Sequence, residues 1–110
     1  MQAIKNKVLL DKALEKSNHE PILIFKHSDS CPVSSEAYDE VLKFEKKVET
    51  PIFLIVVQDN RDESNQVEQV LEIKHESPQI ILVNESHAKL TLNHEDVTED
   101  NLFEMMMKFE

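Results

Sequence analysis

Residues 22–34 read ILIFKHSDSCPVS and contain Cys31, the only cysteine of the chain. The first four of these residues are apolar and follow a proline, a pattern typical of a strand buried in a parallel sheet. The polar residues 28–30 end the apolar run, and Pro32 suits the first turn of a helix. The stretch therefore predicts a central strand, a short loop and a helix that begins next to Cys31.

Helix and strand patterns alternate on both sides of this stretch. Apolar residues recur at helical spacing over residues 5–17, and the β-branched run 52–57 indicates a second interior strand. Residues 63–73 again have helical spacing, with Asp62 or Ser64 as the predicted cap. The apolar residues expected to face the core in the first three helices are Ile4, Val8, Leu10, Leu14, Ala37, Val41, Leu42, Phe44, Val67, Val70, Leu71 and Ile73.

The last part of the chain predicts an antiparallel hairpin followed by a helix. The apolar run 80–83 and the alternating residues 90–92 flank the turn-like residues 84–86, and Thr98 begins the final helix. Strands that alternate with helices favour parallel pairing through right-handed crossovers, to which the hairpin adds antiparallel strands. The order predicts a three-layer α/β fold of the thioredoxin type, with about four strands in a mixed central sheet and about four flanking helices. We find no repeat or linker, so a single domain over residues 1–110 is expected.

Composition narrows the range of partners and compartments. The chain has 12 basic and 22 acidic side chains and a net charge of −10, which disfavours nucleic acid and anionic membrane surfaces. The longest apolar run is too short to span a bilayer, and residues 1–16 lack the apolar stretch of a signal peptide. A lone cysteine fits a reducing compartment, so we expect a cytoplasmic protein. The chain has no glycine, and positive φ angles are predicted at Asn60, Asn84 and Asn93.

Cys31 is the candidate nucleophile because of its predicted position. The carboxyl ends of strands in an open α/β sheet form ligand sites, and a helix start stabilises anions such as the reactive thiolate. Ser30 and Pro32 support this placement at the helix start. The alternative is that Cys31 is a small buried side chain without chemistry.

Ser34 stands where a C-x-x-C motif has its second cysteine. A hydroxyl cannot resolve a mixed disulfide, so an external thiol is needed to release any adduct on Cys31. The Ser34 hydroxyl could hydrogen-bond to the thiolate or cap the helix. The pattern predicts monothiol chemistry.

Other residues could complete a site around this thiol. Ser77-Pro78 precedes the third predicted strand, where the topology favours a cis bond and a Ser77 backbone available for pairing with a bound thiol or peptide. His27, His75 and His94 could tune the ionisation of the thiol if they converge on it. No metal site is predicted, because the histidines are scattered and the chain lacks paired ligands at short spacing.

Two motifs, Phe25-Lys26-His27-Ser28 with Ser30-Cys31-Pro32-Val33-Ser34 and Lys74-His75-Glu76-Ser77-Pro78-Gln79, together resemble the monothiol bacilliredoxins. The resemblance implies a thioredoxin fold and an enzyme that removes bacillithiol from mixed disulfides on cytoplasmic proteins of bacteria that make this thiol. It further implies that Cys31 is the nucleophile, that Ser34 fills the unreactive partner position and that Ser77-Pro78 is the cis-proline segment. Bacillithiol would be a co-substrate, with no bound cofactor, and the partners would be S-bacillithiolated proteins and a low-molecular-weight thiol.

Relatives generally have glycine in the hairpin and near the last helix, whereas this chain has residues 84–85 and 93–96 without any. The alternative function is a redox-inactive thioredoxin-fold module that binds a protein partner in the groove around Cys31 and Pro78. Reduction of arsenate or peroxide by the same thiol is a third alternative.

Overall fold

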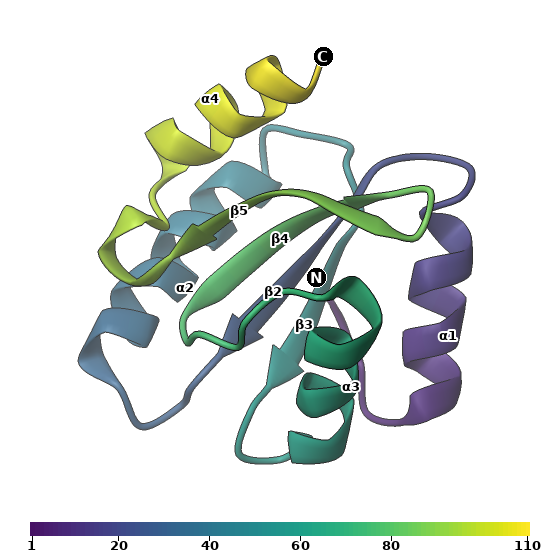
Figure 1. Cartoon of the computed structure of the whole chain (residues 1–110). Helices are drawn as coiled ribbons and strands as arrows, with labels where there is room; N and C mark the ends of the chain where they lie inside the picture. The colour runs from purple at the N-terminus through teal and green to yellow at the C-terminus, as the bar shows by residue number, and fades with distance from the viewer.

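A computed structural model describes all residues, 1–110, as one mixed sheet between two layers of helices (Figure 1). The elements in chain order are β1 (Gln2–Ala3), α1 (Lys7–Lys16), β2 (Ile22–His27), α2 (Pro32–Glu45), β3 (Ile52–Val56), α3 (Arg61–Leu71), β4 (Gln79–Asn84), β5 (His87–Asn93), the 3-10 turn η1 (His94–Asp96) and α4 (Glu99–Phe109). The predicted order of helices, strands and hairpin is confirmed.

The sheet has five strands in the order β1-β3-β2-β4-β5. Strands β1, β3 and β2 are parallel, whereas β4 pairs antiparallel with β2 and β5 antiparallel with β4. The strand missed by the sequence patterns is β1, because its two residues are too few to show a periodicity. The arrangement is the predicted three-layer α/β fold.

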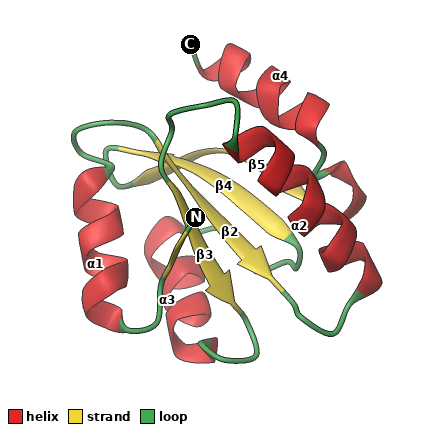
Figure 2. Cartoon of the chain, turned by 180° about the vertical axis from the view of Figure 1, so that it is seen from behind, coloured by secondary structure: helices red, strands yellow, loops and turns green.

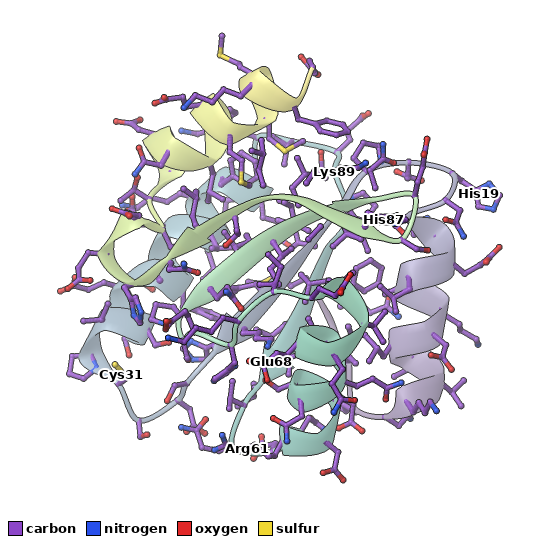
Figure 3. All side chains as sticks on the ribbon, viewed as in Figure 1. His19, Cys31, Arg61, Glu68, His87 and Lys89 are labelled. Carbon is purple, nitrogen blue, oxygen red and sulfur yellow. The ribbon has the colours of Figure 1, made fainter.

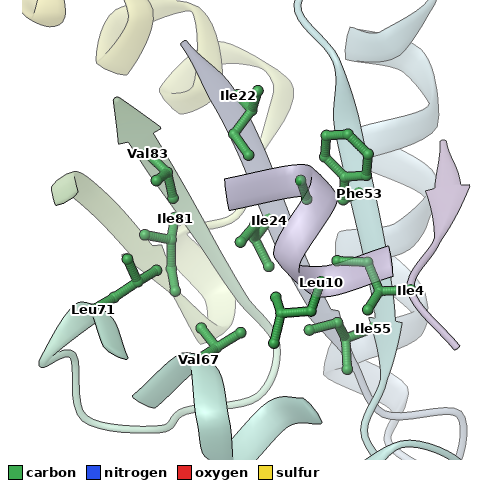
Figure 4. Close-up of a cluster of buried hydrophobic side chains, with 11 residues drawn as sticks. Ile4, Leu10, Ile22, Ile24, Phe53, Ile55, Val67, Leu71, Ile81 and Val83 are labelled. Atoms are coloured by element: carbon green, nitrogen blue, oxygen red, sulfur yellow. The ribbon is translucent and has the colours of Figure 1, made fainter. Parts of the chain in front are cut away.

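Each face of the sheet packs against its own pair of helices. Helices α1 and α3 cover one face and α2 and α4 the other, as the two opposite views show (Figures 1 and 2). The cluster under α1 and α3 includes Leu10, Ile24 and Val67 (Figure 4). Phe25 and Phe44 belong to the other cluster. Side chains alternate between the two faces along β2, so this central strand is apolar on both sides.

Two apolar residues predicted to face the core are exposed. Val8 is 61% exposed and Val70 is 46% exposed. Val8 lies two residues before buried Leu10, which places it about 200° away around the helix axis. Val70 lies beside the buried stripe formed by Val67 and Leu71.

The predicted start of α3 is wrong by two residues. Asn60 precedes the helix, and neither Asp62 nor Ser64 caps it. The Asn60 carbonyl accepts from the Ser64 N–H at 3.0 Å, so Ser64 already lies within the helix and its side chain is buried. Thr98 does cap α4, since its hydroxyl accepts from the Asn101 N–H at 3.1 Å.

The predicted positive φ angles are also wrong. They occur at Glu72, Glu85, Ser86 and His94 instead of at the three asparagines. Glu85 and Ser86 form the two-residue turn between paired Asn84 and His87, and such hairpin turns require positive φ at both central residues. The turn geometry therefore determines these angles, although neither residue type favours them.

None of the helices is long and apolar enough to cross a membrane.

Candidate active site at the start of helix α2

Cys31 is the N-cap residue of α2 and has extended backbone angles, φ −113° and ψ 124°. Its thiol is free and the residue is partly exposed, at the outer end of the loop that follows β2 (Figure 3). The Cys31 carbonyl accepts from the Ser35 N–H at 3.1 Å, which begins the helix. Because Pro32 has no N–H, the first free amides of the helix are those of Val33 and Ser34. The thiol therefore lies outside the core, next to the positive end of a helix dipole.

Ser34 is fully buried and its hydroxyl accepts a hydrogen bond from the Ser28 N–H at 2.9 Å. The side chain therefore ties the first turn of α2 back to the end of β2. This contact differs from both roles considered for the hydroxyl, a bond to the thiolate and a cap on the helix. Through this hydrogen bond, Ser34 holds the loop that carries Cys31.

Gln58 holds the same loop from the other side. Its Oε1 accepts from the Asp29 N–H at 3.2 Å, and its Nε2 donates to the hydroxyls of Ser28 and Ser30. The residue lies in the connection after β3, distant from Cys31 in the sequence. A lone glutamine in a loop carries no sequence signal, so sequence patterns do not identify this contact.

The Ser77–Pro78 peptide bond is cis, as predicted, and Pro78 is buried. Gln79 follows it and pairs with Lys26 near the carboxyl end of β2. The loop with Cys31 begins at that same end, so the Ser77–Pro78 segment and Cys31 share one edge of the sheet. The Pro78 carbonyl accepts from the His94 N–H at 2.8 Å, which joins the start of η1 to this edge.

His27 and His94 have different surroundings near this edge. The His27 ring is 4.9 Å from the Tyr38 ring on α2, and its Nδ1 is buried without a hydrogen-bond partner. Burial lowers the pKa of His27, against the opposing charge of Asp29. His94 is exposed, and its Nε2 lies 3.1 Å from the Glu76 carboxylate. His27 is therefore a packed, uncharged ring near neutral pH. His94 lies at the surface beside Glu76.

His75 contacts a lysine that the sequence analysis did not single out. Its Nδ1 lies 3.2 Å from the Nζ of Lys26, a fully buried residue, and 3.4 Å from the Ser64 hydroxyl. Burial lowers the pKa of His75, and the Lys26 charge lowers it further. Burial also lowers the pKa of Lys26 to about 8, although Glu68 opposes the shift. The three histidines thus have separate contacts, and none of these contacts is to Cys31.

A groove of about 370 Å³ runs along α2 from Val33 to Lys43. Val33 and Glu36 on the helix line one side, and His94 and Glu95 line the other. Carboxylates on both walls make the groove acidic. The groove begins at Val33, two residues after Cys31.

Comparison with known proteins gives a family and a fold. Residues 2–102 match the protein family described as monothiol bacilliredoxin BrxC. A solved structure described as a proposed oxidoreductase with a thioredoxin fold is 25% identical, with a TM-score of 0.87 over 96% of this chain and 92% of the other. Thioredoxin from Fasciola hepatica is 13% identical, with a TM-score of 0.82 over 100% of both chains. Thioredoxin from Aeropyrum pernix is 12% identical, with a TM-score of 0.70 over 92% of this chain and 83% of the other. The thioredoxins establish the fold alone.

Proposed function

The chain belongs to the monothiol bacilliredoxin family, and from this premise we propose that it removes bacillithiol from mixed disulfides on proteins, with Cys31 as the nucleophile. Family and fold support the broader class, a thiol–disulfide oxidoreductase. The observation that carries the proposal is the position of the thiol. Cys31 is partly exposed at the start of α2, at the sheet edge that also holds the Ser77–Pro78 segment.

The reaction is a thiol–disulfide exchange without net oxidation. The Cys31 thiolate attacks the bacillithiol sulfur of the mixed disulfide, so that a Cys31–bacillithiol disulfide forms and the bond to the substrate cysteine breaks. The substrate cysteine leaves as a thiolate and takes a proton from water. A helix start with free amides favours a nearby anion, and Cys31 lies at the start of α2.

Release of the adduct needs a second thiol. Ser34 has no nucleophilic sulfur and its hydroxyl is bonded to the Ser28 amide. An external low-molecular-weight thiol, for which we propose bacillithiol itself, therefore attacks the adduct on Cys31. That step breaks the disulfide on Cys31, regenerates the Cys31 thiol and joins the incoming bacillithiol to the bacillithiol released from the adduct as their disulfide. The proposed partners are thus S-bacillithiolated proteins in a reducing compartment, the cytoplasm.

Turnover on a defined substrate tests the proposal. A purified protein that carries bacillithiol on one cysteine is incubated with excess bacillithiol, and loss of the adduct is followed by chromatography. We expect the wild type to accelerate release by roughly tenfold or more, whereas Cys31→Ser has no effect. Ser35→Ala, an exposed change beside the site, is the matched control and is expected to keep full activity.

The small thiol that is attached to the substrate protein in the mixed disulfide distinguishes the proposal from its alternatives. The same protein carrying glutathione is expected to react more slowly, since the proposal assigns the site to bacillithiol. Equal rates for both adducts would contradict the bacillithiol role. Wild-type activity no greater than that of Cys31→Ser, together with capture of the substrate protein by both, would favour a binding module without redox chemistry.

A further inference from the structure

Lys26 is a buried ammonium under helix α3. On β2 it shares a face with Ile22 and Ile24, two residues of the apolar cluster that α1 and α3 cover. The residue has no exposed surface. Its Nζ donates to the main-chain carbonyl of Ser64 at 3.0 Å and lies 3.2 Å from the His75 Nδ1. One side chain therefore joins β2 and α3 to the segment that leads into β4.

That segment, residues 74–78, is held at several further points. The His75 N–H donates to the Glu68 carboxylate on α3 at 2.6 Å. Gln79 Nε2 donates to the Lys74 carbonyl and to Asn93 Oδ1, both at 3.0 Å. The buried lysine, the α3 carboxylate and the β4 amide thus surround the residues that precede Ser77–Pro78.

The Lys26–His75 contact determines which ring nitrogen carries the proton. A charged ammonium has three donors and no acceptor, so the His75 Nδ1 must accept and the proton lies on Nε2. Both pKa shifts agree with this assignment, because His75 is held neutral while Lys26, with a pKa of about 8, is still mostly charged at pH 7. The other charged groups that act on the pair are Glu68, Arg61 and Glu76.

A purely structural filler would not need this charge. Burial of an ammonium costs free energy, and an apolar side chain of similar length would pack at lower cost. Methionine is such an apolar side chain, but it lacks the N–H donors with which Lys26 reaches Ser64 and His75. The contact with His75 lies two residues before Ser77.

We propose that Lys26 is a positioning residue whose ammonium, through His75, orients the Ser77 main chain so that a substrate mixed disulfide lies in line with Cys31. The role rests on the proposed function and concerns alignment of the protein substrate. Lys26 does not contact the Cys31 sulfur. Its removal should therefore weaken substrate binding while the intrinsic reactivity of the thiol is kept.

The first test observes the contact without any activity. Ring nitrogen chemical shifts of His75 are measured by NMR at pH 7, and His75→Leu assigns the signals. We expect unprotonated Nδ1 and protonated Nε2 in the wild type, and loss of this single tautomer in Lys26→Met. A wild-type ring protonated at Nδ1, or a tautomer that is unchanged in Lys26→Met, would overturn the proposal.

The second test separates alignment from thiol chemistry. We expect Lys26→Met to raise the KM for a bacillithiolated protein by roughly tenfold, with the rate of Cys31 alkylation by iodoacetamide within about twofold of wild type. Lys12→Met, an exposed change on α1, is the control and should alter neither value. A wild type without turnover would refute the proposed function, whereas an active wild type and an unchanged KM in Lys26→Met would refute only the role of Lys26.

Variants of the other partner keep the test valid if Lys26→Met does not fold. His75→Leu removes the acceptor and should raise the KM to a similar extent. His75→Asn places an amide oxygen near the position of Nδ1 and should recover most of the loss, because the contact with Lys26 can reform. Equal KM values for the two variants would contradict a role that acts through this contact.

Discussion

Cys31 and Ser34 are the first and last residues of the C-x-x-S motif, and they differ in their exposure to solvent. Cys31 is partly exposed, and its side chain makes no capping bond. Ser34 is fully buried and bonded to the Ser28 amide. One helical turn therefore supplies both the reactive group and the hydrogen bond that holds its loop.

The bond of Ser34 predicts a stability effect. Ser34→Ala leaves the Ser28 N–H without its acceptor, and we expect the free energy of unfolding to fall by about 1–2 kcal/mol. Urea denaturation measures the change. The neighbouring exposed change Ser35→Ala should stay within about 0.5 kcal/mol of wild type. Equal stabilities for the two variants would show that the Ser28 amide does not depend on Ser34.

Lys26 predicts a pH dependence of stability. Burial lowers the pKa of Lys26 from its ordinary value of 10.5 to about 8 in the folded chain, so the unfolded chain binds more protons between these two values. Stability should therefore rise with pH from about 8 to 10.5, by up to about 3 kcal/mol relative to Lys26→Met. The measurement is the difference in unfolding free energy between the two proteins at each pH. A difference that stays constant over this range would contradict a lowered pKa of Lys26 in the folded chain.

At the scale of elements, the loop between β2 and α2 depends on distant partners. Ser34 holds it from the helix and Gln58 from the connection after β3. The loop therefore has a defined conformation although residues 29 and 30 are exposed. This conformation places Cys31 at the end of the sheet.

Gln58→Ala is expected to loosen that loop without unfolding the domain. Loss of the acceptor for the Asp29 N–H should raise its hydrogen-exchange rate by roughly tenfold, because local opening becomes easier. Global stability should change by less than about 1 kcal/mol, since the contact is exposed. Gln69→Ala, on the exposed side of α3, is the control. An unchanged exchange rate of the Asp29 amide would show that Gln58 does not stabilise the loop.

The end of α3 offers a prediction about backbone conformation. Glu72 caps this helix with φ 55°, a left-handed angle that costs a residue with a Cβ about 1 kcal/mol. Glu72→Gly should therefore raise the free energy of unfolding by about 0.5–1 kcal/mol. Gln69→Gly, within the same helix, should lower it by about 1 kcal/mol. A loss of stability in both variants would contradict the left-handed cap.

At the scale of the whole molecule, local patterns predict the architecture better than they predict the site. The strand 22–25, Pro32 at the helix start and Thr98 at the last cap each have a signal within a few residues. Those predictions are confirmed. Short strand β1 has no such signal, because its two residues form a strand by pairing with β3, about 50 residues away in the chain.

The supports of the site depend on contacts between distant segments. Lys26 contacts Ser64 and His75, which lie 38 and 49 residues away, and Gln58 contacts Ser28 across 30 residues. Only the folded chain brings these groups together. The positive φ angles follow the same rule, since the hairpin places Glu85 and Ser86 in the turn regardless of their type.

The net charge of −10 is a property of the whole surface, and carboxylates also line the groove beside α2. A substrate protein must approach Cys31 through this field. The charge of a substrate protein therefore affects the rate at which it reaches Cys31. Detection of the adduct on the Cys31 sulfur tests the proposal without depending on that rate.

Intact-mass spectrometry after a single encounter with a bacillithiolated protein, without added thiol, is that test. Because the chain has one cysteine, a mass increase by one bacillithiol in disulfide linkage must lie on Cys31. We predict this increase in the wild type, with equimolar release of reduced substrate, and its absence in Cys31→Ser. A wild-type chain that stays unmodified while the substrate keeps its adduct would contradict the assignment of Cys31 as the nucleophile.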